Sequence, residues 1–149
     1  MHAARTILTG CALAFAAIAP LAAQTVKPGQ KVPLLQSDHG WTGSAYTAYP
    51  KGRPQLTMIK LIVAPHSALP WHTHPQPNTG YILSGALTLQ DRATGKTTTV
   101  RAGQVFAETV DQVHRGVNES DVPTVVLLTY AGVVGVPTTV PAKGEQSEY

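Results

Sequence analysis

Two histidines separated by a single residue are the strongest chemical feature of the sequence. His72 and His74 flank Thr73 in the stretch 70–85, PWHTHPQPNTGYILSG. Side chains of an extended strand alternate between its two faces, so both imidazoles are expected to point to one side, a few ångströms apart. Neutral imidazole is a common ligand of divalent metals. The pair therefore predicts part of a metal site whose remaining ligands come from elsewhere in the chain.

The composition indicates one folded domain. The chain has 149 residues, of which 43% are hydrophobic and 13% charged, which is enough apolar material for a core and too little charge for a disordered chain. The net charge is +3, and the basic residues are scattered, with no Lys/Arg run. This pattern excludes a nucleic-acid-binding surface, and we expect no nucleic acid partner.

Residues 1–23 have the pattern of a secretory signal peptide. Arg5 provides the positive start, residues 7–19 the apolar segment, and residues 21–23 the small residues before a cut after Ala23. The sequence therefore predicts a periplasmic or secreted protein that has no membrane association after cleavage. The only cysteine, Cys11, is removed with this segment. Disulfides and cysteine nucleophiles are then excluded, and metal ligands must be histidine, carboxylate or amide groups.

Short strands separated by turn residues fill the rest of the chain, and no stretch has a convincing helical period. We expect an N-terminal arm at 24–40, a β-barrel domain at 41–136 and a polar, loosely held tail at 137–149. This pattern is typical of an all-β sandwich or barrel. The expected strands are an edge strand within 38–48 and strands at 56–63, 80–84, 86–90, 96–100, 105–110, 114–118 and 122–130.

The histidine stretch resembles the first motif of the cupin family. That motif has H-x-H, then a glutamate, then a glycine at a tight turn. His72, His74 and Gly85 match it, and Asn78 stands at the glutamate position. The departure at Asn78 puts the usual fourth metal ligand in doubt.

A second cupin-like motif follows, with Gly103, His114 and Asn118 in order and residues 109–111 in place of the usual P-x-G. The resemblance implies a single-domain cupin, a double-stranded β-helix or jelly-roll barrel, whose motif histidines face the interior and bind a divalent metal. It also implies a homodimer, formed through edge strands or the N-terminal arm. We expect Asn118 to fix a strand turn.

The resemblance makes His114 the third imidazole beside His72 and His74. Three imidazoles suit Fe, Mn, Ni, Cu, Co or Zn. Three arrangements stay open for the rest of the site: water and substrate fill the open positions, Gln76 or Asn78 contacts a bound water, or Glu108 supplies a carboxylate.

The direction of Glu108 depends on which face of its strand is buried. Phe106 and Glu108 share a face by alternation. If that face is interior, the carboxylate needs a metal or another cation beside it; if it is exterior, Glu108 is a solvated charge. Phe106, Gln76, Asn78 and Tyr81 are the further residues expected at the pocket.

Other catalytic patterns are absent from the sequence, which has no G-x-S-x-G, Walker or G-x-G-x-x-G motif. The leading hypothesis is a metal-binding cupin of the cell envelope that takes a small organic ligand to a three-histidine site, as an enzyme of the dioxygenase or isomerase type. The alternative is a non-catalytic cupin module that binds a small molecule or metal. The missing glutamate at Asn78 favours the alternative.

Overall fold

A computed structural model describes residues 29–147 of the chain, so the signal peptide expected at residues 1–23 lies outside the described residues. Contacts between residues divide the chain into residues 1–32 and 33–149, and the second unit holds every strand. The described residues form ten strands and no helix, which confirms the all-β prediction. Accordingly, the described part of the chain has no helix of the length and apolar character that crossing a membrane requires.

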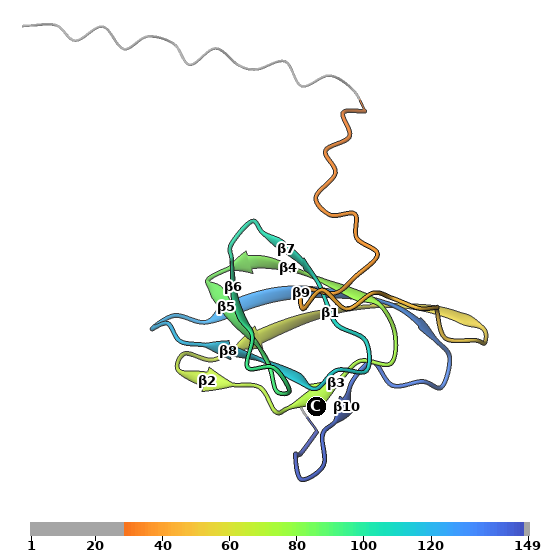
Figure 1. Cartoon of the computed structure of the whole chain (residues 1–149). Helices are drawn as coiled ribbons and strands as arrows, with labels where there is room; N and C mark the ends of the chain where they lie inside the picture. The colour runs from red at the N-terminus through yellow and green to blue at the C-terminus, as the bar shows by residue number, and fades with distance from the viewer. Residues whose placement is uncertain (1–28, 148–149) are drawn as a thin grey trace, which may run out of the picture. The chain divides into compact units, whose positions relative to one another are not determined.

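Two antiparallel sheets face each other across the interior (Figure 1). The first sheet has the order β1 (Pro54–Val63), β9 (Thr124–Val133), β4 (Asn78–Ser84) and β7 (Val105–Ala107). The second sheet has the order β10 (Val140–Pro141), β3 (His72–Thr73), β8 (His114–Asn118), β5 (Ala86–Asp91) and β6 (Thr97–Arg101), and β2 (Ser67–Ala68) also pairs with β8. From β6 to β10, successive strands alternate between the two sheets, as in a jelly roll.

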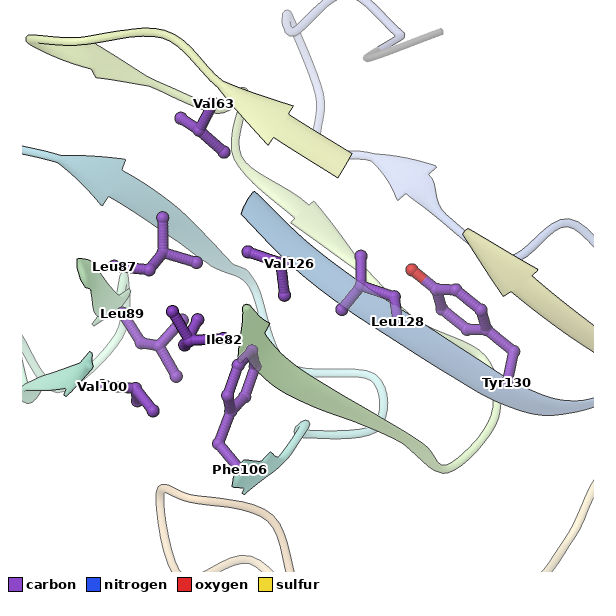
Figure 2. Close-up of a cluster of buried hydrophobic side chains, with 9 residues drawn as sticks. All are labelled: Val63, Ile82, Leu87, Leu89, Val100, Phe106, Val126, Leu128 and Tyr130. Atoms are coloured by element: carbon purple, nitrogen blue, oxygen red, sulfur yellow. The ribbon is translucent and has the colours of Figure 1, made fainter. Parts of the chain in front are cut away.

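The core lies between the sheets and follows from period-two alternation. On β9, Val126, Leu128 and Tyr130 are buried, while the residues between them lie on the outer face. Burying a side chain of this size contributes about 1.5–3 kcal/mol. The full cluster, shown in Figure 2, is Val63, Ile82, Leu87, Leu89, Val100, Phe106, Val126, Leu128 and Tyr130.

Gly80 makes room for one of these aromatic side chains. It stands directly opposite Phe106 in the pairing of β4 with β7. A Cβ atom at Gly80 would collide with the Phe106 ring. The glycine therefore allows the outer edge of the phenyl ring to approach the β4 backbone inside the core.

The main predicted strands are confirmed, with shifts of a few residues at their ends. The edge strand expected within 38–48 is wrong, because this stretch makes only an isolated bridge between His39 and Ala45. A turn at Gly40–Gly43, closed by Gly43 N donating to Gly40 O at 2.9 Å, interrupts it. The strand expected at 105–110 ends at Ala107, because the chain then turns through Asp111, which has a positive φ of 56°.

Asn118 ties strand ends together, as the sequence predicted. Its Nδ2 donates to the carbonyls of Val63 at 3.1 Å, Ala64 at 3.1 Å and Val122 at 2.8 Å. These bonds satisfy carbonyls at the end of β1 and before β9, where the sheet ladder stops.

The C-terminal segment is more ordered than the sequence predicted. Residues 137–149 were expected to be a loose polar tail, but β10 pairs with β3, with Val140 opposite Thr73 and Pro141 opposite His72. The prediction failed because backbone hydrogen bonding needs no apolar side chain, so this contact leaves no hydrophobic pattern in the sequence.

Candidate metal centre

Three buried histidines converge between the sheets. His72 on β3 stands opposite His114 on β8, and His74 follows β3 and makes a parallel bridge with Val110. The centroids of the imidazole rings lie 4.8 Å apart for His72 and His74, 4.6 Å for His72 and His114, and 5.0 Å for His74 and His114. Their candidate ligand atoms all lie within 4.8 Å of one another. The alternation expected for H-x-H therefore holds, and β8 brings the third ring.

Backbone carbonyls orient all three rings. Each imidazole has its Nδ1 at hydrogen-bond distance from a carbonyl oxygen: His72 from Pro70 at 2.9 Å, His74 from Thr138 at 2.8 Å and His114 from Gln112 at 2.8 Å. A carbonyl only accepts, so Nδ1 must carry the proton and donate it. The lone pair of each neutral ring is then on Nε2, the arrangement that metal-binding histidines use.

Glu108 adds a carboxylate to this cluster. Its Oε2 lies 3.2 Å from His114 Nε2, and its Oε1 lies 4.0 Å from His74 Nε2. Glu108 is only 5% exposed, and it lines the same cavity as Phe106 two residues earlier. The structure thus places the Phe106–Glu108 face in the interior, so Glu108 is not a solvated charge.

The charges of this cluster are set by burial and proximity. Burial alone would raise the pKa of the Glu108 carboxyl group, but the neighbouring imidazole of His114, followed by those of His74 and His72, outweighs burial and lowers this pKa to about 2. Burial lowers the pKa of His74 to about 4, although Glu108 opposes the change. At neutral pH the cluster therefore combines an ionised carboxylate with a neutral His74 imidazole, a donor set that suits a divalent cation.

The cavity at the cluster is small. It encloses about 20 Å³, enough for one water-sized occupant. Apart from the three histidines, Glu108 and Tyr130, the described residues that line it have no polar side chain: Leu61, Leu69, Leu87, Leu89, Phe106, Gly116, Val126 and Leu128. An organic molecule larger than one water can enter this cavity only if side chains or a segment of backbone move.

The remaining predicted pocket residues divide into two groups. Phe106 lines the cavity at the histidines. Gln76 and Asn78 are buried but do not line it; Gln76 Nε2 donates to Pro137 O at 3.3 Å, and Asn78 Nδ2 to Gln76 O at 3.4 Å. Tyr81 does not belong to the pocket, because β4 alternation turns it to the face opposite Asn78, Gly80 and Ile82.

Asn78 and Glu108 are neighbours on adjacent segments. Glu108 N donates to Asn78 O at 3.0 Å, which continues the pairing of β4 with β7 by one residue. The carboxylate therefore comes from the position across from Asn78, where the family motif has its glutamate. This explains how the chain keeps a carboxylate at the cluster while carrying an amide at position 78.

Three supporting features were not found from the sequence. The carbonyls of Thr138 and Gln112 hold two of the rings, and a backbone acceptor leaves no side-chain signature. Asp111 adopts a positive φ of 56° and its N donates to His74 O at 3.0 Å. The sequence could have indicated this turn, because Asp111 belongs to the segment 109–111 that replaces the usual P-x-G. Aspartate is one of the few residues that replaces glycine at positive φ.

Comparisons with known proteins support the fold. A family model described as a cupin domain matches residues 60–130. No curated protein matches the chain.

Solved structures also resemble the chain, at identities that show the fold alone. An uncharacterized Klebsiella pneumoniae protein with a double-stranded beta-helix domain is 19% identical, with a TM-score of 0.51 over 66% of this chain and 92% of that one. A Lactobacillus farciminis oxalate decarboxylase in complex with formate is 18% identical, with a TM-score of 0.50 over 58% of this chain. A Bacillus subtilis oxalate decarboxylase is 22% identical, with a TM-score of 0.51 over 58% of this chain. The matches span only 26% and 23% of the two decarboxylases.

Proposed function

Because residues 60–130 are a cupin domain, which places the chain in the cupin superfamily, we propose that it binds one divalent transition metal ion through His72, His74, His114 and Glu108. Three imidazoles and one carboxylate form a mixed nitrogen and oxygen donor set. Such a set suits Mn, Fe, Co, Ni, Cu or Zn better than Mg or Ca, which prefer oxygen ligands.

The orientation of the three rings is the observation that carries this proposal. Each Nδ1 donates to a backbone carbonyl at 2.8–2.9 Å, so the tautomers are set by the fold. A site whose ligands are oriented in advance binds metal without the entropy cost of ordering them. Three buried imidazoles held for packing alone would not require the same tautomer at all three positions.

A bound metal ion would polarise the oxygen atoms of a small ligand or support redox chemistry. We propose that the ligand is a small organic molecule or dioxygen, because the cavity of about 20 Å³ leaves little space beside an ion. The oxalate decarboxylases of similar fold make short carboxylates the first compounds to test. The cell-envelope location expected from residues 1–23 is part of the same proposal.

A non-catalytic metal- or ligand-binding module is the second candidate. The small cavity favours it, and so does the lining, in which Tyr130 is the one polar side chain among the described residues outside the four proposed ligands. An enzyme that transfers protons needs a general acid or base within reach of its substrate. Such groups are scarce in this cavity, which favours the non-catalytic candidate. The two candidates share the metal and differ in turnover.

Metal loading of the purified protein tests the shared proposal. Metal-free protein is titrated separately with Mn(II), Fe(II) without oxygen, Co(II), Ni(II), Cu(II) and Zn(II), and bound metal is measured by elemental analysis. We expect one ion per chain, and none in His72→Ala or His114→Ala. His66→Ala is the matched control, because His66 lies exposed on the surface beside Asp121 at 2.8 Å. Absence of bound metal under every condition would contradict the proposal.

Turnover separates the two candidates. The loaded protein is assayed for oxygen uptake and for carbon dioxide release with oxalate and other short carboxylates, phenols and diketones. Turnover that disappears in His114→Ala and persists in His66→Ala supports the enzyme. Stoichiometric metal without turnover on any compound supports the binding module.

A further inference from the structure

The C-terminal strap, residues 137–142, runs beside the H-x-H stretch. Its strand β10 pairs antiparallel with β3, with Val140 opposite Thr73. Beyond the pairing, Ala142 N donates to Trp71 O at 2.8 Å. The strap therefore continues the second sheet at the edge where two of the three histidines lie (Figure 1).

Two successive carbonyls of the strap accept hydrogen bonds from side chains of the H-x-H stretch. Thr138 O accepts from His74 Nδ1 at 2.8 Å, and Pro137 O accepts from Gln76 Nε2 at 3.3 Å. His74 and Gln76 are two residues apart, so they present their side chains to the same segment. The strap thus contacts the proposed site through a proposed ligand and a buried neighbour of that ligand.

His74 differs from the other two histidines in what orients it. His72 and His114 donate to carbonyls only 2 residues away in the sequence. His74 donates to a carbonyl 64 residues away. The first two rings are therefore oriented by local backbone, whereas the orientation of His74 requires the strap to be docked.

The strap is held by backbone hydrogen bonds and buries little apolar surface. Its ladder with β3 is two residues long, and Pro137, Val140 and Pro141 are exposed. No residue of the strap belongs to the hydrophobic core cluster. A segment with few buried apolar contacts opens locally at a small fraction of the free energy of global unfolding.

From this geometry we propose that the strap is a positioning element of the metal site, which controls how tightly the site holds its ion and how quickly it releases it. Docking of the strap fixes the His74 ring with Nε2 toward the cluster; undocking removes the Nδ1 acceptor and lets the ring rotate or change tautomer. The inference rests on the proposed metal binding and adds a device that regulates it. Loss of such a hydrogen-bond partner costs metal sites about 10–100-fold in affinity.

Two truncations test the strap directly. One variant ends at Val136 and lacks the strap; the matched control ends at Ala142 and keeps every strap contact described above. Zinc affinity is measured by competition with a chromogenic chelator, and zinc release by the rate of transfer to excess chelator. We expect the variant ending at Val136 to bind zinc about 10–100-fold more weakly and to release it faster, and the control to match the full chain.

A full-length variant guards against a folding defect in the truncation. Val140→Gly with Pro141→Gly keeps the strap but raises the entropy cost of docking it. We expect a smaller loss of zinc affinity in the same direction, with an unchanged circular dichroism spectrum. Unchanged zinc affinity in both the folded truncation and this variant would overturn the inference and leave the proposed metal site intact.

The tautomer of His74 gives a measurement that needs no metal. In the metal-free full chain, ¹⁵N NMR is expected to show His74 with its proton on Nδ1; in the variant ending at Val136 we expect a mixture of tautomers. The tautomer of His72 serves as the internal control and should not change. A His74 tautomer that is indifferent to the strap would overturn the inference, whereas failure of the full chain to bind any metal would overturn the proposed function.

Discussion

The interior between the sheets has two ends that are built on different principles. Along β9, the inward-facing side chains run from Val126 through Leu128 to Tyr130 (Figure 2). The ring centroid of Tyr130 lies 5.5 Å from that of His74. One end holds apolar side chains that make no hydrogen bonds, and some of them, such as Val126 and Leu128, extend to the cavity at the histidines. The other end holds three imidazoles and a carboxylate, each buried.

The two ends differ in what their burial costs. Removing aliphatic surface from water stabilises the fold at about 25 cal/mol per Å² and needs only a good fit. Burying an ionisable group costs free energy unless hydrogen bonds or a counter-charge compensate it. The carbonyls that accept from the histidines supply part of this compensation, and a metal ion would supply more. The apolar end is therefore expected to determine the stability of the metal-free protein. The polar end is expected to determine how much metal binding changes that stability.

Shortening a buried aliphatic side chain at the apolar end should have the largest effect on the free energy of unfolding. Ile82 is fully buried and does not line the metal cavity. Ile82→Ala leaves a cavity and is expected to lower the free energy of unfolding by about 2–5 kcal/mol, measured by urea denaturation. Metal stoichiometry should stay that of the wild type. A loss of metal binding in the folded variant would show that the two ends are not independent.

Metal should stabilise the protein only through the polar end. Zinc at about 100 times its Kd is expected to raise the free energy of unfolding by about 2.7 kcal/mol. His114→Ala should abolish this increase, because it removes a ligand and leaves the apolar end unchanged. Thermal melts with zinc and with a chelator measure the difference, and His66→Ala should respond as the wild type does. Equal zinc stabilisation of His114→Ala would contradict the assignment of the site.

The cross-strand relation of Asn78 and Glu108 allows a rescue experiment. Glu108→Gln keeps the shape of the side chain but removes its charge, and it should weaken zinc binding by tenfold or more, about 1.4 kcal/mol. Adding Asn78→Glu to this variant returns a carboxylate from the adjacent strand, since the two residues share a backbone hydrogen bond of 3.0 Å. We expect the double variant to recover most of the lost affinity in calorimetry. A double variant as weak as Glu108→Gln would show that the two positions do not reach the same space.

Acid should destabilise the metal-free protein through His74, with the smallest effect of the four. Burial lowers the pKa of His74 from 6.5 to about 4, so the unfolded chain binds a proton between these values and the folded chain does not. Stability is therefore expected to fall as the pH drops below 6.5, by about 1 kcal/mol between pH 7 and pH 5.5. The pKa of Glu108 is also lowered, from 4.5 to about 2, so its contribution is lost only below this window. Urea denaturation across the range checks the prediction, and constant stability from pH 7 to pH 5.5 would contradict it.

Much of this molecule was predictable because the signals are local. The period-two pattern located β1 and the strands from β4 to β9 within a few residues, but not the two-residue strand β2, and H-x-H placed His72 and His74 on one face. Both follow from the geometry of an extended chain, which needs no knowledge of the rest of the fold. Tyr81 was expected at the pocket, but it lies on the outer face of β4. The alternation of β4 was evident from the sequence, whereas which of its two faces is buried was not.

The sequence by itself determined the all-β class and the H-x-H pair, and its resemblance to the cupin family added the jelly-roll architecture and His114 as the third imidazole. Only the tertiary structure decided that Glu108 faces inward beside Asn78, and that the tail returns to hold His74 through Thr138 O at 2.8 Å. The first depends on which face of a strand the opposite sheet covers. The second depends on a backbone carbonyl, which every residue carries. Contacts of this kind leave no mark in side-chain identity, so they become visible only when distant parts of the chain are brought together.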